Sequence, residues 1–145
     1  MKTFTTVNTA DLTQTDLSRA GATLLRVALG IMFIAHSVVL KYFTFTLAGT
    51  AQYFVSIGLP GFLAYVVFAL EAVGGVLLVL GIRTRWVALG LVPVLLGATW
   101  VHLSNGWVFN APNGGWEYPL FLIVISLVVA AQAYGSNRSP SGGAN

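Results

Sequence analysis

Four long runs of apolar residues alternate with short polar or glycine-rich segments along the chain. The runs cover residues 20–45, 61–82, 86–103 and 116–134. About 20 apolar residues, at a helical rise of ~1.5 Å each, are enough to cross the hydrocarbon of a bilayer. The pattern therefore predicts an all-α integral membrane protein, a bundle of four transmembrane helices.

The segments that flank these runs suggest the domain organisation. Residues 1–19 are polar and rich in Thr, and residues 136–145 are rich in Gly, Ser and Pro. The first segment has too few Lys and Arg residues for the start of a secretory signal, and the second has the composition of a disordered tail. We expect a cytoplasmic N-terminal tail at 1–19, a membrane domain at 20–135 and a disordered C-terminal tail at 136–145.

The composition supports the membrane assignment and excludes several classes of function. Of the 145 residues, 57% are hydrophobic and only 8% are charged, against about 25% charged in soluble domains. The formal net charge of +3 comes without a basic patch interleaved with aromatics, so nucleic-acid binding is not expected. The chain has no Cys, which excludes thiolate catalysis, disulfide exchange and Cys-ligated haem or iron–sulfur clusters.

The distribution of Lys and Arg predicts the orientation. With four spans, both tails and the turn at 83–85 lie on one side of the membrane. That side carries Lys2, Arg19, Arg83, Arg85 and Arg138. The other side has Lys41 alone, which with Tyr42 is expected to anchor the far end of the first span. The positive-inside rule then places both termini in the cytoplasm.

Glu71 is the only charged residue of the second run. A charge near the middle of a bilayer costs roughly 2.5–3.5 kcal/mol on insertion scales. Glu71 should therefore be protonated, paired, or beside a polar cavity. Counted from the cytoplasmic edge, Arg26 lies about 9 Å deep and Glu71 about 18 Å deep, so a bond between them is feasible if the first two spans are adjacent. The contact would lock two helices, relay protons or bind a quinone head group; alternatively, Arg26 snorkels to the surface alone.

A second candidate set lies farther from the cytoplasmic edge. His36 and His102 each fall about 24 Å along their helices, and Glu117 begins the fourth run at nearly the same level. With the neighbouring Trp residues they form either a wet interfacial belt or a site for a quinone or another small polar ligand. Haem ligation by the two His, or a metal held by two His and a carboxylate, is permitted by the spacing but disfavoured, and no metal ligand is assigned.

Small residues recur inside the apolar runs. They are Gly30, Gly74, Gly75, Gly90 and Gly97. Glycine in a membrane helix allows a neighbouring backbone to approach closely. We expect helix packing at these positions and no cofactor-cradling loop.

The order of several motifs resembles the DoxX family of small bacterial and archaeal membrane proteins. The matching pieces run from residue 20 to 135: Arg26-x-Ala-Leu-Gly30, Gly58-Leu-Pro60, Glu71 with Gly74-Gly75, the Gly81-Ile-Arg-Thr-Arg85 turn, His102 and Glu117. The resemblance implies a four-helix membrane bundle. It also implies a link to quinone chemistry, since relatives look like components associated with a terminal quinol oxidase or with thiosulfate:quinone oxidoreductase.

Three functional hypotheses follow. The first is a membrane subunit or accessory of a quinone-linked redox system, a possible oxidoreductase component, with Arg26 and Glu71 as an inner site and His102 and Glu117 as an outer one. The second is a non-catalytic scaffold or assembly subunit that packs against a larger membrane complex. The third is a carrier or proton-conducting bundle. Besides the lipid bilayer, the expected partner is another membrane protein or a second copy of the chain.

Overall fold

The computed structural model describes residues 9–136, with side chains described for residues 14–135. Helices make up nearly all of this range: α1 (Thr9–Ile34), the π-helix η1 (Ala35–Thr44), α2 (Leu47–Ser56), α3 (Phe62–Leu80), α4 (Thr84–His102), the short η2 (Leu103–Asn105) and α5 (Glu117–Ser136). Four helical segments are long and apolar enough to cross a membrane: Gln14–Thr44, Phe62–Leu80, Thr84–Asn105 and Glu117–Gly135. The predicted all-α bundle of four transmembrane helices is confirmed.

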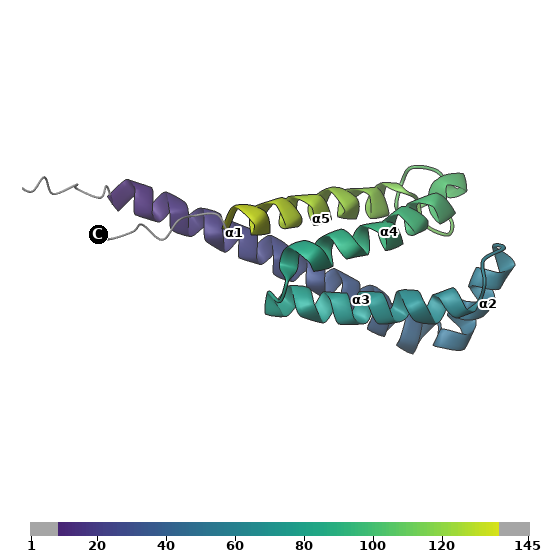
Figure 1. Cartoon of the computed structure of the whole chain (residues 1–145). Coiled ribbons are helices and arrows are strands. Elements are labelled where there is room, and N and C mark those ends of the chain that lie inside the picture. The colour runs from purple at the N-terminus through teal and green to yellow at the C-terminus, as the bar shows by residue number, and fades with distance from the viewer. Residues whose placement is uncertain (1–8, 137–145) are drawn as a thin grey trace, which may run out of the picture.

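The boundaries of the first span differ from expectation. The α1 helix begins at Thr9, inside the segment predicted to be a tail, and its first turns extend beyond the other helices (Figure 1). Most of the segment between the first two apolar runs forms α2. The predicted C-terminal tail lies outside the described residues except for Ser136, the last residue of α5.

The helices are arranged as two packed pairs. The α1 helix packs along α3, and α4 packs along α5, while contacts of α1 with α5 and of α3 with α4 join the pairs. We call the end with the 81–83 turn the arginine end, and the end with α2 and the 103–116 loop the loop end. Toward the loop end, α3 and η1 diverge from α4 and α5 (Figure 1).

A tight turn sets the α3–α4 hairpin. Gly81 adopts a left-handed backbone (φ 75°), which glycine adopts without steric cost. Its N–H donates to the Leu78 carbonyl at 3.1 Å, and the Ile82 N–H donates to the Leu77 carbonyl at 2.9 Å. These two bonds form the Schellman motif that ends many helices, so α4 can return directly alongside α3.

Three of the predicted glycine contacts are present. A Cβ on Gly30 would lie 2.7 Å from the Gly75 carbonyl oxygen, and a Cβ on Gly74 would lie 2.9 Å from the Leu91 side chain. The α1 and α3 backbones therefore meet at Gly30 and Gly75. The prediction is wrong for Gly90 and Gly97, where an added Cβ would meet nothing within 4 Å, because these two residues face away from the neighbouring helices.

The core lies where the four spans meet and is entirely aliphatic apart from one Phe. Its buried members are Leu29, Phe33, Leu78, Ala88, Leu91, Leu95, Leu122, Ile123, Val129 and Ala130. Many other large apolar side chains on all four spans are exposed. Such a surface is expected where lipid, rather than water, is the solvent.

The first span changes its hydrogen bonding after Ile34. In η1, bonds run from residue i+5 to residue i, as in the 2.8 Å bond from the Phe45 N–H to the Leu40 carbonyl. The buried Ser37 hydroxyl donates to the carbonyls of Phe33 (2.8 Å) and Ile34 (3.2 Å), where the α-helical pattern is lost. Long π-helices are rare, and π-type distortions often occur at functional sites. The η1 helix carries both His36 and Lys41.

Candidate functional site

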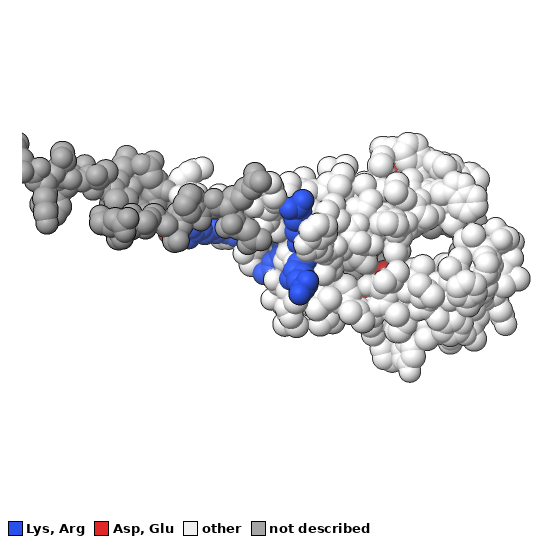
Figure 2. All heavy atoms as spheres, viewed as in Figure 1, with Lys and Arg blue, Asp and Glu red and all other residues white. Residues whose placement is uncertain are grey.

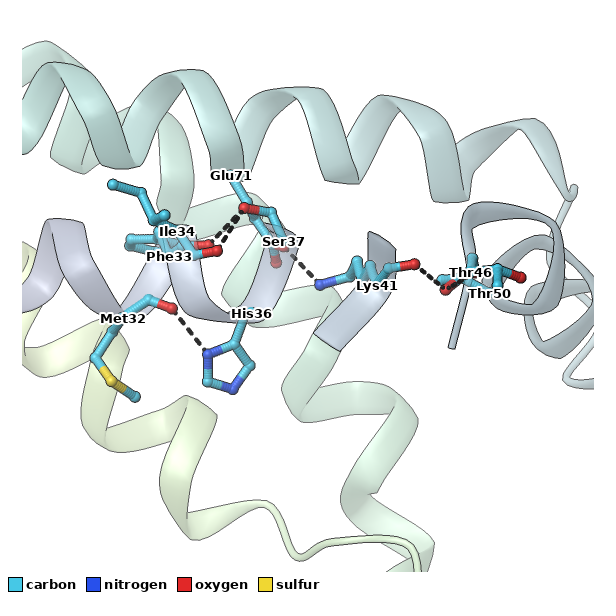
Figure 3. A network of polar contacts seen from close by, with 9 residues as sticks. All are labelled: Met32, Phe33, Ile34, His36, Ser37, Lys41, Thr46, Thr50 and Glu71. Carbon is cyan, nitrogen blue, oxygen red and sulfur yellow. Dashed lines mark hydrogen bonds and ion pairs between the residues drawn. The ribbon is translucent and has the colours of Figure 1, made fainter. Parts of the chain in front are cut away.

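Glu71 is paired, but with a residue that the sequence analysis assigned elsewhere. The Lys41 ammonium nitrogen on η1 lies 2.5 Å from the Glu71 Oε2 on α3 (Figure 3). The two side chains are only 17% and 8% exposed. A buried charge persists in an apolar medium when an opposite charge compensates it. Lys41 is therefore not an interfacial anchor: it points into the bundle and stabilises the Glu71 carboxylate.

Arg26 does not contact Glu71. Its guanidinium donates to the carbonyls of Leu78 and Val79, the latter at 2.9 Å, in the last turn of α3. The contact of Gly30 with Gly75 explains this difference, because in this antiparallel register Arg26 falls opposite the C-terminal end of α3 and not opposite its middle. Arg26 donates to carbonyls at the negative end of the α3 dipole, which is a structural role.

His36 lies near the ion pair and faces α5. Its Nδ1 is 2.9 Å from the Met32 carbonyl oxygen, and a carbonyl can only accept, so Nδ1 carries the proton in this bond. The imidazole stacks on the Tyr118 ring, with centroids 5.6 Å apart and 23° between the planes. Figure 3 shows His36 and Lys41 leaving η1 about one turn apart.

His102 and Glu117 each have a local partner near the loop end. The His102 Nδ1 is 2.7 Å from the Ala98 carbonyl oxygen, and its ring packs against Gly114, where a Cβ would come within 3.3 Å of it. The Glu117 carboxylate accepts a 2.7 Å hydrogen bond from the Phe109 N–H. Both side chains hold the 103–116 loop, and no direct bond joins either of them to His36 in the described part of the chain.

The structure does not gather a metal-ligand set. Among residues 9–136, no three His, Asp or Glu side chains lie close enough together to hold a metal ion. His36, His102 and Glu117 are therefore not placed as the ligands of one metal ion; each has a hydrogen bond within its own helix or to the neighbouring loop. What comes together instead is Lys41, Glu71, His36 and Tyr118.

The loop end is open where the two helix pairs diverge. Figure 2 shows a gap through the molecule at this end, opposite the blue arginines, and an acidic side chain set back between the helices. On the surface of α5 and the 103–116 loop lies a hollow of about 450 Å³. Its lining is mainly aromatic and aliphatic and consists of Trp107, Phe109, Glu117, Tyr118, Leu120, Phe121 and Val124. Tyr118 thus borders this hollow and also contacts His36.

Two members of the site were missed by sequence reasoning. Lys41 lies near the end of an apolar run, which is where interfacial anchors occur, and only the fold shows that it reaches back to Glu71. Tyr118 follows the candidate Glu117 directly but carried no signal of its own. A buried Lys is a common partner for a buried carboxylate, so Lys41 was available as an alternative to Arg26.

Comparisons with known proteins identify the family of this chain. The DoxX family profile matches residues 21–103, which include α3, Arg26, Lys41 and Glu71. A protein of Bacillus subtilis (strain 168) named "Putative oxidoreductase CatD" is 40% identical over 115 residues, covering 79% of this chain and 81% of the relative. No solved structure matches. With more than half of its length matched by the profile, this chain is a member of the DoxX family.

Proposed function

We propose that the protein is a membrane subunit or accessory of a quinone-linked redox system, and that its ligand site is centred on the Lys41–Glu71 pair. The observation that carries the proposal is this ion pair, buried inside two membrane spans and 2.5 Å long. Intramembrane ionisable residues are costly and usually mark ligand or proton pathways. The name of the Bacillus subtilis relative, which includes the word oxidoreductase, supports a redox role.

The chemistry of the site suits a quinone head group. The Lys41 ammonium has three N–H donors and uses one on Glu71 Oε2, so it can donate another to a carbonyl oxygen of the ring. The hollow bordered by Tyr118 is lined mainly by aromatic and aliphatic side chains, as an isoprenoid-bearing ring in a membrane requires. The gap at the loop end that the space-filling view shows is the proposed route by which a lipid-soluble molecule enters (Figure 2).

The proposal includes topology and partners. Both termini and the 81–85 turn lie in the cytoplasm, following the Lys and Arg distribution, so the loop end lies toward the outer face of a bacterial cytoplasmic membrane. A protein of this size, without any Cys for an iron–sulfur cluster, needs a second redox protein as electron donor or acceptor. The partner is another membrane protein of the same system.

Binding of quinone to the purified protein tests this function. The protein is placed in lipid nanodiscs and titrated with a short-chain ubiquinone or menaquinone, alongside the Glu71→Gln and Lys41→Met variants. We expect micromolar binding by the wild type and at least tenfold weaker binding by both variants. Tyr65→Phe, an exposed position on α3, is the control that should bind as the wild type does. A wild type that binds no quinone but co-purifies with a larger membrane complex would instead favour a non-catalytic scaffold.

A further inference from the structure

The Tyr118 hydroxyl is buried and lacks a hydrogen-bond partner among the described residues. Native proteins satisfy almost all of their buried polar atoms. A hydroxyl left without a partner beside a candidate ligand site therefore indicates that something outside the chain supplies the partner. Because a hydroxyl both donates and accepts, this oxygen does not by itself reveal what the missing group is.

The hydrogen bonding of His36 indicates which kind of group the missing partner of the Tyr118 hydroxyl is. Its Nδ1 proton is used by the Met32 carbonyl, so in the neutral ring Nε2 carries no proton and can only accept. No hydrogen bond to Nε2 is present in the described part of the chain. The facing pair thus offers one acceptor, His36 Nε2, and one donor, the Tyr118 hydroxyl. The two rings stack with centroids 5.6 Å apart, so the acceptor and the donor belong to one contact between η1 and α5.

From these observations we infer that His36 and Tyr118 together bind one hydroxyl group of the ligand and thereby select its reduced, hydroquinone form. This inference rests on the proposed function, which supplies the quinone class of ligand. A phenolic hydroxyl accepts a bond from Tyr118 and donates its own proton to His36 Nε2. A quinone carbonyl accepts from Tyr118 but has no proton for His36, so two lone pairs face each other.

The two residues consequently have different roles. Tyr118 donates to the ligand oxygen in either redox form and contributes to affinity. His36 bonds to the hydroxyl form alone and contributes to selectivity. Lys41 and Glu71 lie on the α3 side of η1, and they are not required for the preference between the two forms.

Dissociation constants for both redox forms test the inference. Protein in nanodiscs is titrated anaerobically at pH 7.5 with decylubiquinol and with decylubiquinone. The wild type should bind the quinol about tenfold more tightly than the quinone. His36→Phe keeps the ring stack but removes the acceptor. The affinities for quinol and quinone should therefore become about equal, through a loss of quinol affinity alone. Tyr118→Phe should weaken both forms by a similar factor.

His102→Phe is the matched control, because His102 makes the same local Nδ1 bond to a carbonyl four residues earlier but lies against Gly114. Its quinol preference should equal that of the wild type. Equal binding of quinol and quinone by the wild type would overturn the inference and leave the proposed function standing, since quinone binding at the Lys41–Glu71 pair does not depend on this preference. Binding of neither form would remove the proposed function as well. The wild-type ratio decides the matter even if His36→Phe fails to fold.

Discussion

Lys41 and Glu71 are 30 residues apart in the chain, and their charged groups lie 2.5 Å apart inside the bundle. They come from η1 and α3, helices that run antiparallel and pack together. The Lys side chain is long enough to reach across, and side chains on a helix lean toward its N-terminus, which for Lys41 is toward the middle of the span. The pair makes a carboxylate tolerable at a depth where water is absent.

Breaking the pair should cost more than removing it. Lys41→Met leaves the Glu71 carboxylate buried and unpaired, and we expect a loss of about 3 kcal/mol in the free energy of unfolding. The combined Lys41→Met and Glu71→Gln variant should recover most of that loss, because no uncompensated charge remains. Thermal unfolding in one detergent, arranged as a double-mutant cycle, measures the coupling. Additive effects of the two substitutions would contradict a direct ion pair.

Contact between α1 and α3 depends on the absence of a side chain at Gly30. Gly30→Ala places a methyl group 2.7 Å from the Gly75 carbonyl oxygen and should destabilise the protein by about 1–3 kcal/mol through overpacking. Gly90→Ala is the matched control, since nothing lies within 4 Å of the added Cβ. It should be neutral or stabilise by up to about 1 kcal/mol, because Ala is the better helix former. Equal losses in both variants would argue against the close approach.

Arg26 should matter for stability and not for ligand affinity. Arg26→Met removes the side-chain donor to the Leu78 and Val79 carbonyls and leaves Leu78 with the Gly81 N–H alone, and we expect a loss of about 1–2 kcal/mol. Quinone affinity should change by less than twofold, because Arg26 does not contact Glu71. Arg19→Met, at an exposed position on α1, is the control for loss of charge. A large drop in quinone affinity for Arg26→Met would instead support the pairing of Arg26 with Glu71 that the sequence analysis considered.

Glu117 should fix the 103–116 loop at the start of α5. Its carboxylate accepts from the Phe109 N–H, and its negative charge lies in the first turn of a helix, where the dipole stabilises it. Glu117→Ala should raise amide hydrogen exchange at Phe109 by about fivefold, consistent with ~1 kcal/mol for one such bond. Glu117→Gln retains an acceptor oxygen and should change exchange less. Unchanged exchange in Glu117→Ala would show that other contacts hold the loop.

The absence of Cys makes the predicted topology directly measurable. Single substitutions Ile82→Cys, in the turn at the arginine end, and Asn110→Cys, in the 103–116 loop, place one thiol at each end of the bundle. In spheroplasts, which keep an intact cytoplasmic membrane but have no outer barrier, a membrane-impermeant maleimide should label the thiol of the Asn110→Cys variant without further treatment. It should label Ile82→Cys only after the membrane is permeabilised. The reverse pattern would place both termini outside the cytoplasm.

The sequence by itself determined the fold class, the four spans and the demand for a partner at Glu71. These follow from the local requirements of a bilayer: enough apolar residues to cross it, and compensation for any charge within it. The close packing at Gly30, Gly74 and Gly75 was also predicted from their residue type, but the same reasoning was wrong for Gly90 and Gly97, whose orientation only the fold reveals. None of these inferences depends on which helix packs against which neighbour in the bundle.

Only the tertiary structure shows which residue forms the ion pair with Glu71. Whether Arg26 or Lys41 pairs with Glu71 depends on the register of α1 against α3. It also depends on the change to π-helical hydrogen bonding after Ile34, which no pattern in the sequence predicted. The stacking of His36 on Tyr118 likewise joins residues 82 positions apart. Register, rotation and helix contact are set by packing across the whole bundle, so a pattern read along one dimension carries little information about them.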